Sequence, residues 1–197
     1  MQKKLITSSS ALLPTTYGEF KCFAVKEEDN AAEHFVLLKG QVKGRDCLVR
    51  IHSECLTGEV FGSQKCDCGS QLEQSLQMIS QEGGILIYLR QEGRGIGLFN
   101  KIEAYKLQET GLDTVDANLQ LGLPADDRSY LIAVKVLEQL APKAIRLITN
   151  NPQKIMALQE MLKLPIERVN IQPEVNLFNQ KYLKTKATKL KHLISTK

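Results

Sequence analysis

The chain has no apolar run long enough to cross a bilayer. Its first residues, MQKKLITSSSALLPTTYG, also lack the apolar core of a signal peptide, so we expect a cytoplasmic protein with no membrane partner. Neither the G-x-x-x-x-G-K-[ST] phosphate loop nor the G-x-G-x-x-G dinucleotide fingerprint is present. Any nucleotide site in this protein must therefore be built in another way.

No internal repeat, low-complexity tract or Pro/Ser-rich linker divides the 197 residues, which suit one compact domain, so we expect residues 1–197 to form a single domain. In the first sixty residues, the β-type runs EFKCFAV, EHFVLLKGQV and DCLVRIHS predict a β-rich N-terminal lobe with antiparallel strands. From residue 70 onward helix and strand patterns alternate, as in SQLEQSLQMISQEGG, ILIYL, SYLIAVKVLEQLAP, AIRLITN, PQKIMALQEMLK and IERVNI. The sequence predicts a mixed α/β fold in which this alternating layer follows the β-rich lobe.

Acidic residues are missing from residues 175–197, which carry six lysines, while the whole chain has a net charge of only +4. Such a basic tail is typical of a solvated helix face or a frayed chain end. An arm that binds nucleic acid is the alternative. We expect no nucleic-acid partner.

Cysteines are few, and three of the five lie in ECLTGEVFGSQKCDCGSQL with the spacing C-x10-C-x-C, namely Cys55, Cys66 and Cys68. No histidine stands at zinc-finger spacing from them, and a reducing compartment disfavours a disulfide framework. Three thiolates favour a zinc site whose fourth position stays open, although unligated core thiols are the alternative. Cys22 and Cys47 lie in apolar, strand-like segments and are expected to be buried thiols.

Three further segments carry polar groups at the ends of predicted elements. RQEGRGIG, residues 90–97, follows a strand and offers two guanidinium groups and a free helix N-terminus to an anion, unless it is a plain loop. PADDRS places Asp126 and Asp127 at a predicted helix start, where capping is the alternative role. LITNNPQK places Thr149 and Lys154 beyond the carboxyl end of a strand, where ligands bind in α/β sheets. Together with the cysteines, these groups favour zinc-assisted hydrolysis of a phosphorylated substrate.

The motifs RIHSECLTGEVFGSQKCDCGSQL, RQEGRGIGLFNKIEAYKLQE, DTVDAN, LGLPADDRSY and LITNNPQK resemble the GTP cyclohydrolase II family over most of residues 45–155. The resemblance implies hydrolysis of GTP at guanine C8 with ring opening, the first step of riboflavin biosynthesis. The implied products are formate, pyrophosphate and 2,5-diamino-6-(5-phosphoribosylamino)pyrimidin-4(3H)-one. It also implies one Zn²⁺ per subunit, held by three cysteines and a water, Mg²⁺ with the triphosphate, and a homodimer. The chain resembles the stand-alone form of the family, without a second catalytic domain.

The resemblance also implies roles for individual residues. The zinc ligands are Cys55, Cys66 and Cys68, while Asp126 matches the proton acceptor, Arg128 the nucleophile, and Tyr105 a tyrosine needed for ring opening. The implied GTP contacts are Arg50, Ile51, His52, Ser53, Glu54, Gln71, Glu92, Gly93, Arg94, Thr114, Thr149 and Lys154.

Several residues, and the chain as a whole, have an alternative interpretation. A protonated guanidinium has no free lone pair, so Arg128 is expected to be a clamp on the α-phosphate if it is not the nucleophile. Tyr105, on one helix face with Leu98 and Ile102, has the spacing of a core residue. His52 and Glu54, close to Cys55, are candidate bases, and a purely polar role near a strand end is the alternative for His52. The alternatives for the whole chain are a zinc-stabilised nucleotide- or RNA-binding module without turnover, and an enzyme that stops at a formylated intermediate.

Overall fold

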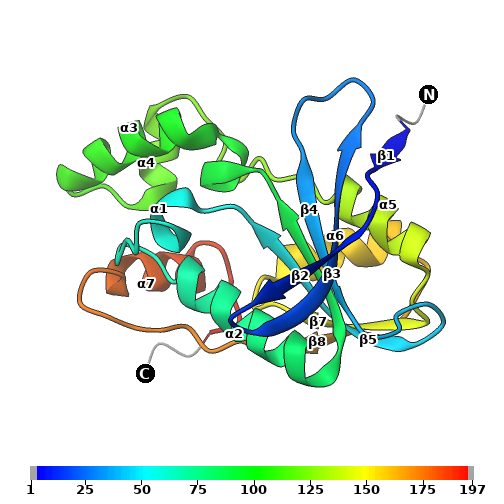
Figure 1. Ribbon diagram of the computed structural model, residues 1–197. Helices are drawn as coiled ribbons and strands as arrows, with labels where there is room; N and C mark the ends of the chain where they lie inside the picture. Colours follow the sequence, from blue (N-terminus) through cyan, green and yellow to red (C-terminus); the bar gives the residue numbers. More distant parts are fainter. Residues whose placement is uncertain (1–3, 195–197) are drawn as a thin grey trace.

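The computed structural model describes residues 4–194, whose strands form one eight-stranded sheet (Figure 1). The strands are β1 (Leu5–Thr7), β2 (Ala11–Thr15), β3 (Gly18–Glu27), β4 (His34–Lys39), β5 (Asp46–Ser53), β6 (Gly84–Leu89), β7 (Ala144–Ile148) and β8 (Ile166–Val169). The helices are α1 (Leu56–Glu59), α2 (Cys68–Glu82), α3 (Gly97–Glu109), α4 (Thr114–Gln120), α5 (Leu131–Leu140), α6 (Pro152–Met161) and α7 (Gln180–Thr188), with a 3₁₀ turn, η1, at Glu92–Gly95. None of these helices has the length and apolarity required to span a membrane.

The sheet is mixed, with the order β1-β3-β4-β6-β5-β7-β8 and with β2 paired to β3. Strands β1 to β4 pair antiparallel, and β4 joins them to β6, also antiparallel. Strands β6, β5, β7 and β8 run parallel. The predicted mixed α/β fold with a β-rich N-terminal part is therefore confirmed.

One strand lies in a different part of the sheet from the one predicted. DCLVRIHS, predicted in the antiparallel lobe, is β5 and runs parallel to both β6 and β7. The connection from β5 to β6 passes through α2, and parallel strands require such a crossover. The apolar run itself carries no information about which strand it pairs with, so its neighbourhood in the sequence is misleading.

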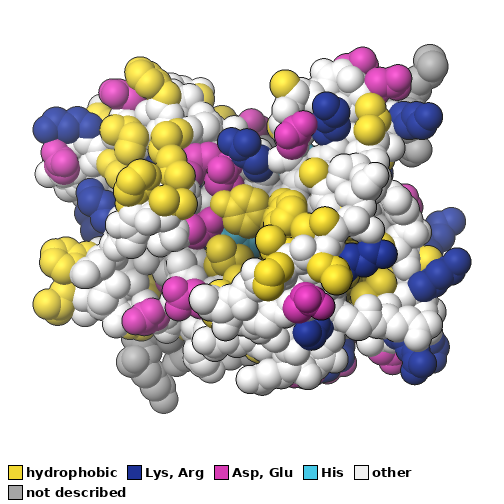
Figure 2. Space-filling model, in the orientation of Figure 1, with side chains coloured by type: hydrophobic (Ala, Val, Ile, Leu, Met, Phe, Trp, Pro, Cys, Tyr) yellow, Lys and Arg dark blue, Asp and Glu magenta, His cyan; other side chains and the backbone are white. Residues whose placement is uncertain are grey.

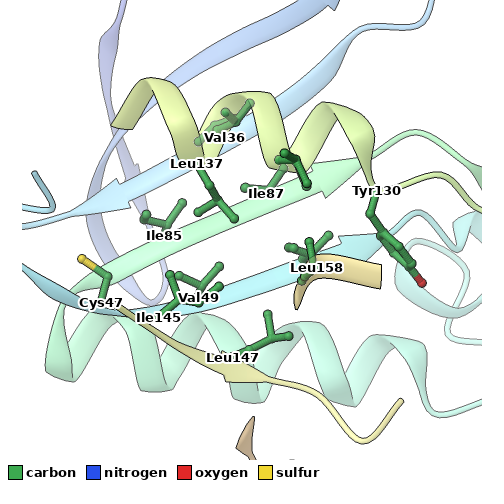
Figure 3. Close-up of a cluster of buried hydrophobic side chains, with 14 of the residues drawn as sticks. Val36, Cys47, Val49, Ile85, Ile87, Tyr130, Leu137, Ile145, Leu147 and Leu158 are labelled. Carbon is green, nitrogen blue, oxygen red and sulfur yellow. The ribbon is translucent and has the colours of Figure 1, made fainter. Parts of the chain in front are cut away.

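Both faces of the sheet are covered, because alternate residues of the central strands point to opposite sides. On one face Val49, Ile85 and Ile87 pack against Leu137 of α5 and Leu158 of α6 (Figure 3). On the other face Phe20, Leu37, Leu48 and Leu86 pack against Ile79 of α2. The remaining helices, α1, α3, α4 and α7, gather at one side of the sheet, on the left in Figure 1.

The basic C-terminal segment is a helix with a largely solvated lysine face, one of the two predicted possibilities, and is not a frayed chain end. Residues 180–188 form α7, in which Leu183, Thr185 and Lys186 are buried. Among the lysines of this segment within residues 4–194, only Lys186 is buried, and it pairs with the carboxylate of Asp67, which is distant in the sequence. Composition counts the lysines but does not locate that partner. Residues 195–197 of the predicted tail lie outside the described residues.

Candidate active site

One pocket opens at the carboxyl ends of the parallel strands, where β5, β6 and β7 pass into Glu54, Arg90 and Thr149. This is the edge at which α/β sheets bind ligands. The pocket is walled by residues of α2, α3 and α7, elements distant in sequence that lie near one another in Figure 1. The sequence-predicted residues that line it are Arg50, His52, Ser53, Glu54, Cys55, Cys66, Cys68, Gln71, Glu92, Gly93, Arg94, Tyr105, Thr114, Arg128, Thr149 and Lys154.

Two of the predicted site residues do not line this pocket. The Ile51 side chain is fully buried in the core on the α5 and α6 face, and only its carbonyl oxygen reaches the site, where it accepts a 2.6 Å hydrogen bond from Lys154 Nζ. Asp126 lies in a neighbouring hollow, and Arg128 lines both spaces. The structure thus links Asp126 to the pocket through Arg128.

The three cysteines converge although they come from different elements. Cys55 follows β5, Cys66 lies in the turn after α1, and Cys68 begins α2. Their sulfur atoms all lie within 4.8 Å of one another, and Cys55 Sγ is 3.7 Å from Cys66 Sγ. Tetrahedral zinc with Zn–S bonds of about 2.3 Å separates its sulfur ligands by roughly 3.8 Å, so the cluster fits such an ion.

Gly58 provides the space for this cluster. A Cβ atom at this position would lie 2.9 Å from Cys66 Sγ and 3.2 Å from Cys55 Sγ. The backbone of α1 therefore forms one wall of the metal site, and any side chain there would push the sulfur atoms apart. Gly69 of α2 packs against the same backbone, because an added Cβ there would lie 2.7 Å from the carbonyl oxygen of Gly58.

Lys101 of α3 is a site residue that sequence reasoning missed. Its buried Nζ lies 3.2 Å from Cys55 Sγ and 2.7 Å from Glu92 Oε1. Burial alone disfavours the charge, but the Glu92 hydrogen bond and the negative charge of Cys55 outweigh it and raise the pKa of Lys101. Its position four residues before Tyr105 was the available signal, because both then lie on one helix face.

Glu92 ties the glycine-rich turn to the cysteine cluster. Its Oε2 accepts a 2.6 Å hydrogen bond from the Leu56 amide, and its Oε1 accepts one of 2.7 Å from the Gly93 amide. Gly93 and Arg94 both have left-handed backbones, with φ of 63° and 62°. At Arg94, which is not a glycine, this conformation is strained, and backbone strain of this kind is typical of functional sites.

On the α2 face of β5, Arg50 and His52 form a buried polar network. Arg50 Nη2 donates to Gln71 Oε1 over 2.7 Å, and Arg50 Nε donates to His52 Nδ1 over 3.3 Å. Since Nδ1 accepts, the proton of the neutral ring is on Nε2, which donates to Glu59 Oε1 over 2.7 Å. Burial, together with the charge of Arg50, lowers the pKa of His52 to about 4 despite Glu59. Both ring nitrogens are occupied, so this geometry does not favour the candidate role of His52 as a base.

Where the pocket meets the neighbouring hollow, Asp126 and Arg128 form a bidentate ion pair. Arg128 Nε donates to Asp126 Oδ1 over 2.8 Å, and Arg128 Nη2 donates to Asp126 Oδ2. The alternative role of Asp126 and Asp127 as helix caps does not hold, because α5 begins only at Leu131 with Tyr130 as its N-cap. The carboxylate is held by the arginine instead of by helix amides.

Buried cations in this region lack a matching number of anions. Burial, followed by the charges of Arg50 and Arg128, lowers the pKa of Lys154 well below its ordinary value. Arg94 Nη2 is buried and has no hydrogen-bond partner within residues 4–194. Such an unsatisfied buried donor commonly marks a place for a bound ion or ligand.

Three residues of the C-terminal segment also line the pocket, namely Tyr182, Lys186 and His192. No motif pointed to them, and the lysine content of the segment predicted the opposite environment. Burial and the neighbouring cations Lys186, Arg128 and Arg94 lower the pKa of His192 to about 3.

Comparison with known proteins identifies the family. A sequence profile described as GTP cyclohydrolase II matches residues 6–169. "Riboflavin biosynthesis protein RibBA" of Bacillus cereus (strain B4264) is 51% identical over 185 residues, which cover 93% of this chain and 47% of that protein. The protein of the same name from Bacillus mycoides (strain KBAB4) is 52% identical over 185 residues, with the same coverage of 93% and 47%. The chain spans about half the length of the curated relatives it matches.

Among solved structures, the chain resembles "RibBX, a two domain 3,4-dihydroxy-2-butanone 4-phosphate synthase from A. baumannii" with a TM-score of 0.52. The sequence identity is 16%, and the match covers 87% of this chain and 41% of the other. At this identity the likeness concerns the fold alone. The profile, in contrast, spans the sheet from β2 to β8 and every cysteine of the cluster, and so the chain belongs to the GTP cyclohydrolase II family.

Proposed function

We propose that the protein hydrolyses GTP at C8 of guanine, opens the imidazole ring, and releases formate and pyrophosphate. The proposed product is 2,5-diamino-6-(5-phosphoribosylamino)pyrimidin-4(3H)-one, and the reaction is the first step of riboflavin biosynthesis. One observation carries this proposal: a three-cysteine cluster and a set of buried cations share a single pocket. A nucleotide bound there presents its purine ring to the cysteines and its phosphates to the cations.

The charge balance of the pocket supports a polyphosphate ligand. Its lining carries the cations Arg50, Lys65, Arg94, Lys101, Arg128, Lys154 and Lys186, but only the acids Glu54 and Glu92. Lys101, Arg128 and Lys186 are paired with Glu92, Asp126 and Asp67, whereas no ion pair within residues 4–194 engages Arg50, Arg94 or Lys154. Burial lowers the pKa of Lys154, and repulsion from Arg50 and Arg128 lowers it further. Phosphate oxygens relieve this repulsion, and they also supply acceptors for buried guanidinium groups such as that of Arg94.

Cys55, Cys66 and Cys68 are proposed to hold Zn²⁺, because three thiolates suit a soft ion and leave its fourth position open. Bound zinc supplies Lewis-acid activation of water at neutral pH. Mg²⁺ is proposed to enter with the triphosphate, where it would offset part of the phosphate charge. Glu92 and Lys101 keep the cysteine cluster and the glycine-rich turn in a fixed relation before any ligand binds.

Proton transfer at the purine end is assigned to Tyr105. Its hydroxyl lies 3.4 Å from Thr57 Oγ1, next to the cysteine cluster. Burial raises the pKa of Tyr105, so the phenol stays protonated at neutral pH and is able to donate to a ring nitrogen as the imidazole opens. This role overrides the core position that helical spacing alone suggests.

Asp126 and Arg128 are assigned to the phosphate end. Burial raises the pKa of Asp126, but the hydrogen bonds and charge of Arg128 outweigh this and lower it, so Asp126 is ionised at neutral pH, the state that its proposed role as proton acceptor requires. Asp126 in turn raises the pKa of Arg128 against the effect of burial. A guanidinium kept protonated is a clamp for the α-phosphate and not a nucleophile, so water is proposed to attack phosphorus.

A homodimer is proposed on the basis of an exposed apolar surface. Val60 and Phe61 next to α1, and Leu98, Phe99 and Ile102 on α3, are all exposed, with Phe61 and Phe99 at 74% and 78%. Figure 2 shows hydrophobic side chains gathered over this region of the molecule. Apolar surfaces of this kind commonly mark protein interfaces.

The proposed location is the cytoplasm, where thiols such as those of the cluster stay reduced. No nucleic-acid or membrane partner is proposed.

The test is to incubate the purified chain with GTP, Zn²⁺ and Mg²⁺ and to measure formate and pyrophosphate separately. Both products are expected. Pyrophosphate without formate contradicts the hydrolysis that releases formate and favours an enzyme that stops at a ring-opened, formylated intermediate. Neither product, with GTP still bound tightly, favours the zinc-stabilised binding module.

A cysteine variant separates the two halves of the reaction. Cys66→Ser is expected to lose formate release while pyrophosphate release survives, because the phosphate end does not use the cysteines. Cys22→Ser, which changes a thiol of β3 outside the cluster, is the matched control and keeps both activities. Equal loss of both products in Cys66→Ser means that the cysteine cluster serves both steps.

A further inference from the structure

The chain beyond residue 169 lies outside the region matched by the family profile, yet it forms one wall of the pocket. Helix α7 supplies Tyr182 and Lys186, and the segment after it supplies His192. The family resemblance assigns no role to these three residues.

Lys186 reaches the turn that carries two of the cysteines. Its Nζ lies 2.6 Å from Oδ1 of Asp67, the residue between Cys66 and Cys68. Both partners are buried, with exposures of 7% for Lys186 and 3% for Asp67. Removing one partner of such a pair leaves an uncompensated buried charge, so the position of the turn depends on Lys186.

The ion pair belongs to a longer chain of hydrogen bonds. Asp67 Oδ2 accepts a 2.6 Å hydrogen bond from Gln71 Nε2, and Gln71 Oε1 accepts one of 2.7 Å from Arg50. Through these contacts α7 is connected to the cysteine turn, to α2 and to β5. Lys186 thus stabilises, through Asp67, the turn that carries Cys66 and Cys68.

Tyr182 makes a separate contact with the glycine-rich turn. The Arg94 guanidinium lies 5.9 Å from the centroid of the Tyr182 ring, and Lys186 Nζ lies 4.6 Å from the same centroid. Both distances are within the range of cation–π attraction. Arg94 is the residue whose Nη2 is buried and unpartnered within residues 4–194. The aromatic ring therefore supports a guanidinium that is ready to accept an anion.

Several contacts fix α7 and the residues after it across the pocket. Lys189 pairs with Asp113 and Asp116 of the α4 N-terminus at 2.6 and 2.7 Å. The Leu193 amide donates to the Asn150 carbonyl over 2.8 Å, beyond the end of β7. The segment thus bridges two edges of the site, and it cannot leave without breaking buried contacts.

We propose that residues 179–194 are a built-in wall of the active site with two positioning residues. Lys186 positions the Cys66–Cys68 turn for the metal through Asp67, and Tyr182 positions Arg94 for the phosphates of the nucleotide. The metal half of the proposal stands on the cysteine cluster, whereas the Tyr182 half rests on the proposed function.

The Lys186 half is tested by zinc affinity, measured by competition with a chromogenic chelator on the full chain. Lys186→Met is expected to weaken zinc binding about 10- to 100-fold, the usual effect of losing a partner behind a metal ligand. Lys186→Arg keeps the charge and is expected to restore most of the affinity. Lys184→Met, an exposed lysine of the same helix, is the control and is expected to leave the affinity unchanged.

The double variant Asp67→Asn/Lys186→Met removes both buried charges and is expected to bind zinc more tightly than Lys186→Met alone. It also replaces the single variant if that protein does not fold. A folded Lys186→Met protein with wild-type zinc affinity overturns the Lys186 half, and so does a double variant that binds zinc no better than a folded Lys186→Met.

The Tyr182 half is tested by steady-state kinetics with GTP. Tyr182→Leu removes the ring and is expected to raise KM about tenfold with little change in kcat or zinc affinity, whereas Tyr182→Phe keeps the ring and behaves like the wild type. An unchanged KM in Tyr182→Leu overturns this half, as does a loss of zinc affinity equal to that of Lys186→Met. If the wild-type chain does not turn over GTP, the proposed function fails while the zinc measurements still decide the role of Lys186.

Discussion

The ammonium nitrogen of Lys101 lies 3.2 Å from the sulfur of Cys55, and both side chains are buried. Three thiolates around a divalent cation leave a net negative charge, which makes a zinc centre a weaker activator of water than one with neutral histidine ligands. A cation that donates to one sulfur reduces this excess. Lys101 is thereby the electrostatic complement of the cysteine cluster, and Glu92 holds it in position at 2.7 Å.

Lys101→Met should therefore weaken zinc binding about 10- to 100-fold and reduce formate release more than pyrophosphate release. The measurement is chelator competition for zinc, followed by separate assays of the two products. Lys106→Met removes an exposed lysine of the same helix and serves as the control. Zinc affinity equal to that of the wild type in Lys101→Met would show that the contact with Cys55 has no effect on the metal.

Gly58→Ala tests the space around the cysteines. The added methyl would lie 2.9 Å from Cys66 Sγ and 3.2 Å from Cys55 Sγ, closer than van der Waals contact allows. Alanine is otherwise favourable in a helix. The variant is expected to fold and to lose zinc affinity by at least about tenfold, as measured by metal content after dialysis and by chelator competition. Gln64→Ala, before the cysteine turn and away from the sulfur atoms, should retain zinc, and full retention by Gly58→Ala would contradict this crowding of the sulfur atoms.

The fold was predictable where the signal is local. Helix α2 shows its period in Leu72, Leu76 and Ile79 and ends at Gly83, as the sequence predicts. The parallel pairing of β5 was not predictable, because the run DCLVRIHS does not encode which strand lies beside it. The outward apolar face of α3, with Leu98 and Ile102 exposed, was also missed, since helical periodicity does not say whether an apolar face meets the core or a partner.

The site residues also divide into those with a local sequence signal and those without one. Cys55, Cys66 and Cys68 were found because thiols at this spacing are rare outside metal sites, and the structure brings them together. Lys101 and Lys186 were missed because a lysine that pairs with a buried group has the same local sequence as one in solvent. Their partners, Glu92 and Asp67, are distant in the chain or in other elements. Only the folded arrangement reveals that these lysines belong to the site.

The bidentate pair of Arg128 and Asp126 leads to a prediction about the phosphate end. Arg128→Lys keeps the positive charge but cannot reproduce the planar, two-pronged contact. Pyrophosphate release should fall roughly 100-fold, in the range found when one donor to a developing charge is removed. Leu131→Ala, which lies in the same neighbouring hollow, is a control of similar position that should change the rate little.

The wild type and Arg128→Lys together also test which group attacks the α-phosphorus. If Arg128 only clamps the phosphate, mass spectrometry of the rapidly quenched wild-type enzyme should detect no guanylyl adduct. A trapped adduct on the wild type that disappears in Arg128→Lys would establish the arginine as the nucleophile instead.

The buried His52 makes the stability of the protein depend on pH. Burial and Arg50 lower its pKa to about 4, from the ordinary 6.5. Between these two values the unfolded chain binds a proton at this ring and the folded chain does not, so the free energy of unfolding falls as the pH decreases through this window. The stability is fully present above pH 6.5, and this one group should remove about 2 kcal/mol of it between pH 7 and pH 5.

His52→Gln isolates this effect, because glutamine can accept from Arg50 and donate to Glu59 but does not titrate. Urea unfolding of both proteins at pH 7 and pH 5, with a chelator present so that metal release does not contribute, should give a loss about 2 kcal/mol larger for the wild type. His192 titrates in both proteins and cancels in the comparison. Equal losses would mean that His52 is not held neutral between Arg50 and Glu59.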